Sequence, residues 1–157
     1  MTLPDYRSGH VLLVEDNPDD LDLTLHAFGK SGLINTMQVV RDGAEALDYL
    51  FGKGEFIGRD VQDVPHLILL DLKLPKVSGI EVLRRIRGNP LIRTIPVVIL
   101  TSSREERDIT ETYGLGVNSY IVKPVSFDEF VKIAGQVGLY WLLINQPPPS
   151  LQLRAGA

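Results

Sequence analysis

The chain has 157 residues, of which 44% are hydrophobic and 23% are charged, a composition typical of one globular domain with a sizeable core. It contains no cysteine, which excludes a disulfide framework, a thiolate metal site and a cysteine nucleophile, and which suits a cytoplasmic protein. The net charge of −4 gives no support for nucleic-acid binding, because domains that bind nucleic acids usually carry a clustered basic face.

No segment of the sequence resembles a signal for export or a membrane span. Residues 1–7 lack the apolar core of a secretion signal and carry an acid and a proline. The longest apolar stretch, residues 137–144, is far shorter than the roughly 20 residues that cross a bilayer as a helix. We therefore expect neither export nor membrane insertion.

Short apolar runs alternate with segments of helical period, a pattern typical of βαβ units and a parallel sheet. The apolar runs predict five strands, at residues 11–14, 37–40, 67–70, 97–100 and 119–122. A helix is expected after each strand, because each is followed by a residue suited to a first helical or capping position: Pro18, Asp42, Ser78, Ser102 or Ser103, and Ser126. The prediction is an α/β fold with five parallel strands and five helices.

Three segments depart from this regular alternation. Residues 52–64 contain three glycines and scattered charge, which predicts a long loop and a candidate insertion. The fourth helix carries Ile109 but few other large apolar residues, so we expect it to be weakly held. The predicted domain spans residues 9–145, between a lead of residues 1–8 and a Pro-rich, mobile tail of residues 146–157.

Chemically versatile side chains follow four of the predicted strands. Glu15 and Asp16 follow the first strand, Asp71 the third, Thr101 the fourth and Lys123 the fifth. In open α/β sheets ligands bind at the carboxyl ends of the strands, so these residues should meet there. Clustered carboxylates repel one another unless a cation lies between them, and oxygen ligands suit Mg²⁺. A carboxylate nucleophile, a metal, an ammonium and a hydroxyl are the groups needed to accept a phosphoryl group.

The chain resembles the receiver domain of bacterial two-component response regulators in six residues and their order. These residues are Glu15-Asp16, Asp71, Thr101, Tyr120 and Lys123, which Pro124 follows. The resemblance covers residues 9–145 and implies a flavodoxin-like, doubly wound sheet with the strand order 2-1-3-4-5. It implies a stand-alone response regulator in which Asp71 takes the phosphoryl group from the phosphohistidine of a sensor histidine kinase. Such a protein signals by protein contact, either as an end regulator or as a carrier in a phosphorelay, without DNA binding. It is not an enzyme beyond its own phosphotransfer and slow dephosphorylation.

The same resemblance implies a ligand set for Mg²⁺. Asp16, Asp71 and the backbone carbonyl of Lys73 would hold the ion, and Glu15 would act through a bound water. Glu15 stands where many relatives carry Asp. We also predict that the Lys73 side chain, at the mouth of the site, changes the lifetime of the phosphoryl group.

A two-state switch is implied as well. Lys123 would contact a phosphoryl oxygen, and Thr101 would form a hydrogen bond once Asp71 is modified. Tyr120 would turn inward as Thr101 moves, although an ordinary strand aromatic is the alternative. The Lys123–Pro124 bond would be cis in this family.

Other functions remain open at this point. A flavodoxin-like carrier shares the strand pattern, but the acidic residues 15–20 would repel a flavin phosphate. A Mg²⁺-dependent aspartate phosphohydrolase generally needs a second acid where this chain has Lys73. A receiver used only as a scaffold is the third alternative. His10, His26 and His66 lack the spacing of metal ligands and are expected to be structural.

Two features narrow the expected partners. The run at residues 71–76, the long loop and the apolar last helix resemble the small response regulators that pair with bacterial phytochromes. In the last helix Phe130, Ala134, Val137 and Trp141 can face the sheet, so Leu139, Leu142 and Leu143 should point partly elsewhere. We predict a C2 homodimer through this helix and the fifth strand, or else a tail that folds back over the patch.

Overall fold

The computed structural model describes residues 10–30, 37–146 and 148. Its five strands form one parallel sheet in the order β2-β1-β3-β4-β5, which confirms the order 2-1-3-4-5. The strands are β1 (Val11–Val14), β2 (Met37–Val40), β3 (Leu67–Leu70), β4 (Val97–Thr101) and β5 (Ser119–Val122). The predicted strands are therefore correct, except that β4 extends one residue further and includes Thr101.

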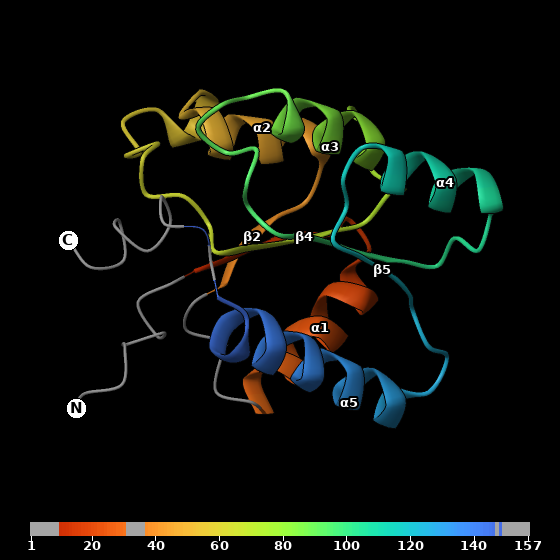
Figure 1. Ribbon diagram of the computed structural model, residues 1–157. Helices are drawn as coiled ribbons and strands as arrows, with labels where there is room; N and C mark the ends of the chain where they lie inside the picture. The colour runs from red at the N-terminus through yellow and green to blue at the C-terminus, as the bar shows by residue number, and fades with distance from the viewer. Residues whose placement is uncertain (1–9, 31–36, 147, 149–157) are drawn as a thin grey trace.

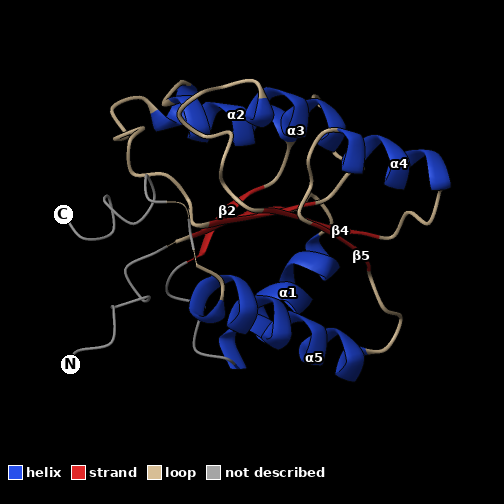
Figure 2. Ribbon diagram, viewed as in Figure 1, coloured by secondary structure: helices blue, strands red, loops and turns tan. Residues whose placement is uncertain are grey.

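Helices cover both faces of the sheet (Figures 1 and 2). One face carries α2 (Gly43–Phe51), α3 (Gly79–Arg87) and α4 (Glu106–Gly114). The other carries α1 (Pro18–Lys30) and α5 (Phe127–Gly138), which pack against each other. A short 3₁₀ segment, η3 (Gly54–Phe56), follows α2, and a π-helical segment, η4 (Leu139–Ile144), continues α5.

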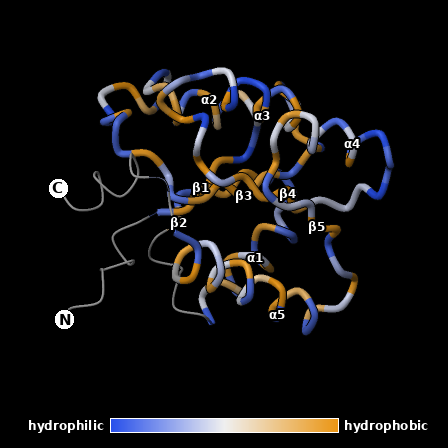
Figure 3. Tube along the Cα trace, viewed as in Figure 1, coloured by the Kyte–Doolittle hydropathy of each residue, from blue (hydrophilic) through white to orange (hydrophobic). Residues whose placement is uncertain are grey.

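Alternation along the strands divides the core into two layers. Leu12 and Leu70 belong to the cluster beneath α2 and α3, whereas Leu13 and Leu69 belong to the cluster beneath α1 and α5. Because both faces are covered, β1, β3 and β4 are apolar at nearly every position (Figure 3). On these three strands a polar side chain can therefore reach water only where the strand ends.

Side-chain caps fix three of the helices as the sequence predicts. The side chain of Asp42 accepts a hydrogen bond from the amide of Glu45. In the same way, Ser78 accepts from the amide of Glu81 and Ser126 from that of Glu129. These caps place the loops that leave the carboxyl ends of β2, β3 and β5.

The expected serine cap of α4 is wrong. This helix starts at Glu106, and its N-cap residue, Glu105, makes no side-chain capping bond. Ser103 is buried instead, and its hydroxyl donates to Asp108 Oδ2 at 2.6 Å and accepts from the Glu105 amide. Only Thr112 of α4 is fully buried, which agrees with the expectation of a weakly held helix.

The segment 52–64 is packed on α2 rather than free. Gly52 adopts a left-handed conformation (φ 67°) that closes α2, and the following η3 places Phe56 edge-on against Tyr49 at 5.0 Å between ring centres. The Arg59 guanidinium lies 3.9 Å from the centre of the Tyr49 ring. The Tyr49 hydroxyl is 2.8 Å from His10 Nε2, a structural role for that histidine.

The last helix differs from its predicted pattern at Leu142, which is 7% exposed and packs with Phe130 and Ala134. The prediction that Leu142 points partly away from the sheet is wrong, because the wider π turn of η4 changes which side chains face inward. Leu139 is 49% exposed, as expected. The side chain of Leu143 and the predicted lead and tail, apart from Gln146 and Pro148, lie outside the described residues.

Candidate functional site

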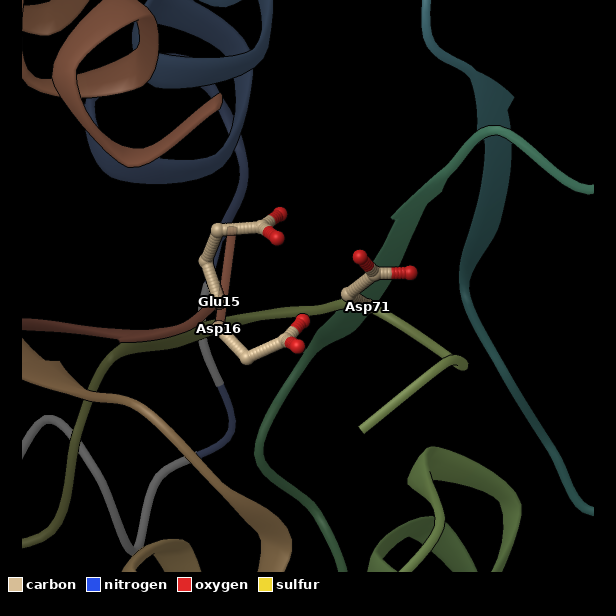
Figure 4. A group of neighbouring side chains, drawn as sticks. All are labelled: Glu15, Asp16 and Asp71. Atoms are coloured by element: carbon tan, nitrogen blue, oxygen red, sulfur yellow. The ribbon is translucent and has the colours of Figure 1, made fainter. Parts of the chain in front are cut away.

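Three carboxylates meet where β1 and β3 end. Val14 and Leu70 are paired in the parallel register, so the residues that follow them, Glu15 and Asp71, emerge side by side. One carboxylate oxygen from each of Glu15, Asp16 and Asp71 lies within 4.8 Å of the other two (Figure 4). The expected convergence of these acids is therefore observed.

Lys123 reaches this group from the end of β5. Its ammonium nitrogen lies 2.7 Å from Glu15 Oε2, 2.8 Å from Asp20 Oδ2 and 3.1 Å from Asp71 Oδ2. The side chain is only 8% exposed, which makes these charge-assisted contacts shielded from solvent. The Lys123 amide donates to the Thr101 carbonyl at 2.7 Å, so pairing with β4 fixes where the side chain starts.

Asp20 is a member of this site that the sequence pattern did not single out. It lies in the first turn of α1, and the Asn17 side chain accepts hydrogen bonds from the amides of Asp19 and Asp20. In the sequence, residues 15–20 stand out only as an acidic loop. The available signal was helical position, because a side chain in the first turn of α1 can turn back toward the end of β1.

The pKa values of two groups at this site, Glu15 and Lys123, are both raised, for different reasons. Burial raises the pKa of Glu15 to about 7, although the hydrogen bond from Lys123 opposes this shift. Burial alone would lower the pKa of Lys123, but its hydrogen bonds to Asp20 and Glu15 and the charge of Asp71 raise it above the ordinary value. Lys123 is therefore a permanent cation at this site.

Thr101 and Tyr120 lie on the side of the site next to α4. Thr101 is fully buried, and its hydroxyl oxygen accepts from the amide of Ser103 at 3.3 Å. The Tyr120 hydroxyl donates to the carbonyl of Ser103 at 2.9 Å, and burial raises the pKa of this phenol. Both side chains thus contact the same turn between β4 and α4.

Asp71 also contacts the turn that follows it. The amide of Lys73 donates to Asp71 Oδ1 at 3.3 Å, and the Lys73 side chain is exposed. The expected cis bond at Lys123–Pro124 is wrong, since the described residues contain no cis peptide. Lys123 reaches the carboxylates with a trans bond because the pairing of β5 with β4 already aims it.

The donor set fits a hard divalent cation. Glu15, Asp16 and Asp71 offer carboxylate oxygens only, which Mg²⁺ and Mn²⁺ accept readily, and no thiolate exists in this chain. Lys123 neutralises part of the negative charge, and the remainder favours a cation. Asp16 is exposed, so a bound ion can keep several of its waters.

The sequence model described as the response regulator receiver domain matches residues 11–134. The chain belongs to this family. Receivers are phosphoacceptor signalling proteins, and the flavodoxin-like fold expected for them is the one observed here. Neither the fold nor the family favours the phosphohydrolase alternative.

Three relatives are especially similar to this receiver. Response regulator Rcp1 of Synechocystis sp. is 38% identical over 84% of this chain and 88% of its own. A crystal structure of a Mn²⁺-bound response regulator Rcp1 has a TM-score of 0.79 at 36% identity, over 89% of this chain and 99% of the other. The phosphorylated cyanobacterial phytochrome response regulator RcpA has a TM-score of 0.82 at 39% identity, over 89% of this chain and 98% of RcpA. The bacteriophytochrome response regulator RtBRR is 51% identical with a TM-score of 0.72, over 94% of this chain and 89% of RtBRR.

The parts of the chain that the structure describes contain no helix that is both long and apolar enough to cross a membrane.

Proposed function

We propose that Asp71 is the phosphoacceptor of this receiver and that its donor is the phosphohistidine of a sensor histidine kinase. The observation that carries the proposal is the position of Asp71: a buried carboxylate at the end of a central strand, next to two further acids and 3.1 Å from an ammonium. A helix-capping aspartate needs none of these neighbours.

The transfer follows from this geometry. An oxygen of the Asp71 carboxylate attacks the phosphorus, the phosphorus–nitrogen bond of the phosphohistidine breaks, and the imidazole nitrogen takes the electron pair. The product is an acyl phosphate on Asp71 and a free histidine. Lys123 lies close enough to Asp71 to neutralise charge on the phosphoryl oxygens, which is the main requirement of such a reaction.

Mg²⁺ is the proposed cofactor, with Asp16, Asp71 and the backbone carbonyl of Lys73 as ligands and Glu15 acting through a water. The oxygen-only donor set and the Mn²⁺-bound relative support a divalent cation. When bound, Mg²⁺ supplies positive charge to the phosphoryl oxygens. The residues of the chain then position the two reactants.

The switch proposed for this receiver involves Thr101, Tyr120 and α4. Thr101 would donate its hydroxyl to the new phosphoryl group, which would draw the turn that holds Ser103 toward Asp71. Tyr120 is bonded to the same turn, so it would have to change partner or move with it. The exposed Lys73 side chain, next to this mouth, would affect how long the phosphoryl group lasts.

The proposed kinase is a bacterial phytochrome. Support comes from the similarity to RcpA, a cyanobacterial phytochrome response regulator, and to RtBRR, a bacteriophytochrome response regulator. Since a histidine kinase makes its phosphohistidine from ATP, the exchange would take place in the cytoplasm. Signalling would proceed by protein contact, with no role for nucleic acid.

We propose in addition a C2 homodimer through η4 and β5. Leu139 and Ile144 are 49% and 62% exposed, and Tyr140 lies exposed between them. The strand β5 is at the edge of the sheet and each of its residues is partly exposed. Sedimentation should show a dimer that Leu139→Asp converts to a monomer, whereas a wild-type monomer at high concentration would rule the dimer out.

Acetyl phosphate and Mg²⁺ test the phosphoacceptor directly. Wild-type protein should gain the mass of one phosphoryl group, about 80 Da, on the peptide that contains Asp71. Asp71→Asn should gain none, and chelation of the metal should prevent the gain in wild type. Purified phytochrome kinase then tests the donor in the same assay. No adduct on Asp71 with donor and metal in excess would refute the proposal.

A further inference from the structure

The ammonium of Lys123 is saturated by three carboxylates. An ammonium has three N–H donors, and the three nearby acceptors are oxygens of Glu15, Asp71 and Asp20. Glu15 and Asp71 follow strands and belong to the group that can hold a cation. Asp20 differs from these two acids, because it reaches Lys123 from the first turn of α1 and is not part of that group.

Capping of α1 does not account for Asp20. The side chain of Asn17 accepts the amide hydrogen bonds at the start of this helix, at 2.9 Å from Asp19 and 3.1 Å from Asp20. Among the described residues the Asp20 carboxylate contacts the ammonium of Lys123, whereas the exposed carboxylate of Asp19 makes no hydrogen bond or ion pair. Both acids interact equally well with the helix dipole, so the contact with Lys123 is what distinguishes them.

We propose that Asp20 is a positioning residue for the phosphotransfer, because it holds the ammonium of Lys123 beside Asp71 as the phosphoryl group arrives. This inference rests on the function proposed above. The side chain of lysine is a flexible stem of four carbons, so holding its ammonium in one place costs conformational entropy. When Asp71 becomes an acyl phosphate, the N–H that faced its carboxylate turns to a phosphoryl oxygen, while Glu15 and Asp20 retain the other two.

Exposure of the three acceptors supports this division of roles. Glu15 is 2% exposed and Asp71 8%, whereas the Asp20 side chain is 33% exposed. Without Asp20, the ammonium would be drawn toward the two interior carboxylates and away from the mouth where the donor enters. Asp20 thus balances Lys123 between the interior of the site and its opening.

The decisive comparison is Asp20→Ala with Asp19→Ala. The two variants remove the same charge from the same turn of α1, so they share any effect on the helix dipole and on net charge. With acetyl phosphate and saturating Mg²⁺, we expect Asp20→Ala to slow phosphorylation of Asp71 by about three- to tenfold, the scale of one partly exposed charge-assisted hydrogen bond. Asp19→Ala should stay within about twofold of wild type. Asp20→Asn keeps an acceptor oxygen and should recover part of the rate.

A double-mutant cycle tests whether Asp20 acts through Lys123. In a Lys123→Ala background, the slower residual phosphorylation should proceed at the same rate with or without the additional Asp20→Ala substitution, because the ammonium is gone. A second readout needs neither metal nor donor: labelling of lysines by an amine reagent, followed by mass spectrometry, should show Lys123 more reactive in Asp20→Ala than in Asp19→Ala.

The outcomes separate this inference from the proposed function. If wild type is phosphorylated but Asp20→Ala matches or exceeds Asp19→Ala in rate, the positioning role is wrong and Asp20 acts only as a repulsive charge. A loss that persists without Lys123 also overturns it. If wild type is never phosphorylated, the proposed function fails, and unchanged labelling of Lys123 in Asp20→Ala would then overturn the Asp20–Lys123 link by itself.

Discussion

Lys123 and Glu15 form an ion pair in which the ammonium nitrogen lies 2.7 Å from Oε2, with both side chains almost fully buried. Burial raises the pKa of Glu15 to about 7 even with this partner. Near neutral pH a proton, the ammonium and a divalent cation therefore compete for the same oxygens.

Affinity for Mg²⁺ should consequently fall as the pH decreases below about 7. Glu15 takes up a proton in this range, and a protonated carboxyl is a poor ligand, so the loss can approach tenfold per pH unit. Calorimetric titration between pH 5.5 and 8 measures it. Glu15→Gln cannot titrate and should give a flatter profile; equal slopes for the two proteins would contradict the assignment.

Stability without metal should show the opposite trend. The folded protein holds the Glu15 proton more tightly than the unfolded chain, whose ordinary value is 4.5. The stability due to this group is complete below pH 4.5 and is lost as the pH rises through about 7. Urea unfolding with chelator, compared with Glu15→Gln, isolates the contribution, and a wild-type excess in stability that grows between pH 5 and 7 would refute it.

Arg87 should be a major source of stability. Its guanidinium donates to the carbonyls of Arg93, Ile95 and Gly116 and to the side chain of Asn118, and so connects α3 to the turns before β4 and β5. Arg87→Ala leaves several acceptors unpaired and should cost about 2–4 kcal/mol in urea unfolding.

Arg85→Ala is the matched control for Arg87, because Arg85 is an exposed arginine of the same helix. It should change the free energy of unfolding by about 0.5 kcal/mol or less. Similar losses in the two variants would mean that the hydrogen bonds of Arg87 contribute little.

Gly43 should be intolerant of a side chain. A Cβ at this position would lie 1.9 Å from the carbonyl oxygen of Val77, in the loop that begins after Asp71. Gly43→Ala must push this loop away from α2, which should cost about 1–3 kcal/mol and weaken Mg²⁺ binding through the displaced Lys73 carbonyl. Gly135→Ala, with no atom within 4 Å of its Cβ, should be neutral or gain about 0.5–1 kcal/mol.

Tyr120→Phe should loosen the turn between β4 and α4. It removes the hydrogen bond to the Ser103 carbonyl, so amides of residues 103–108 should exchange with deuterium faster, while strand amides of β3 should not change. Tyr113→Phe, on the exposed face of α4, serves as the control. Unaltered exchange in Tyr120→Phe would show that the bond does not restrain the turn.

The sequence predicts the strands and the strand-end residues well because one physical rule governs both. A parallel sheet covered on two faces needs apolar runs such as residues 67–70, and polar groups can follow only at the ends. Glu15, Asp16, Asp71 and Lys123 all obey this rule.

What the sequence could not supply depends on three-dimensional register. Asp20 joins the site because the first turn of α1 directs it back to Lys123; its helical position makes this contact possible, but the sequence does not show that Lys123 lies within reach. Leu142 turns inward because η4 widens the helix, a change that no apolar period of 3.6 residues anticipates. Ser103 is buried and does not act as the N-cap of α4, because its hydroxyl donates a hydrogen bond to the Asp108 carboxylate.

The helices of this fold are unequally secured. On one face of the sheet, α1 and α5 pack against each other and the strands through large apolar side chains, and α2 and α3 cover the other face in the same way. By contrast, α4 buries one threonine and is held near its start by the hydrogen bond between Ser103 and Asp108. A structural change at the carboxylates of Glu15, Asp16 and Asp71 should therefore move α4 more readily than the other helices. The packing of the core thus determines which helix can move, independently of phosphorylation.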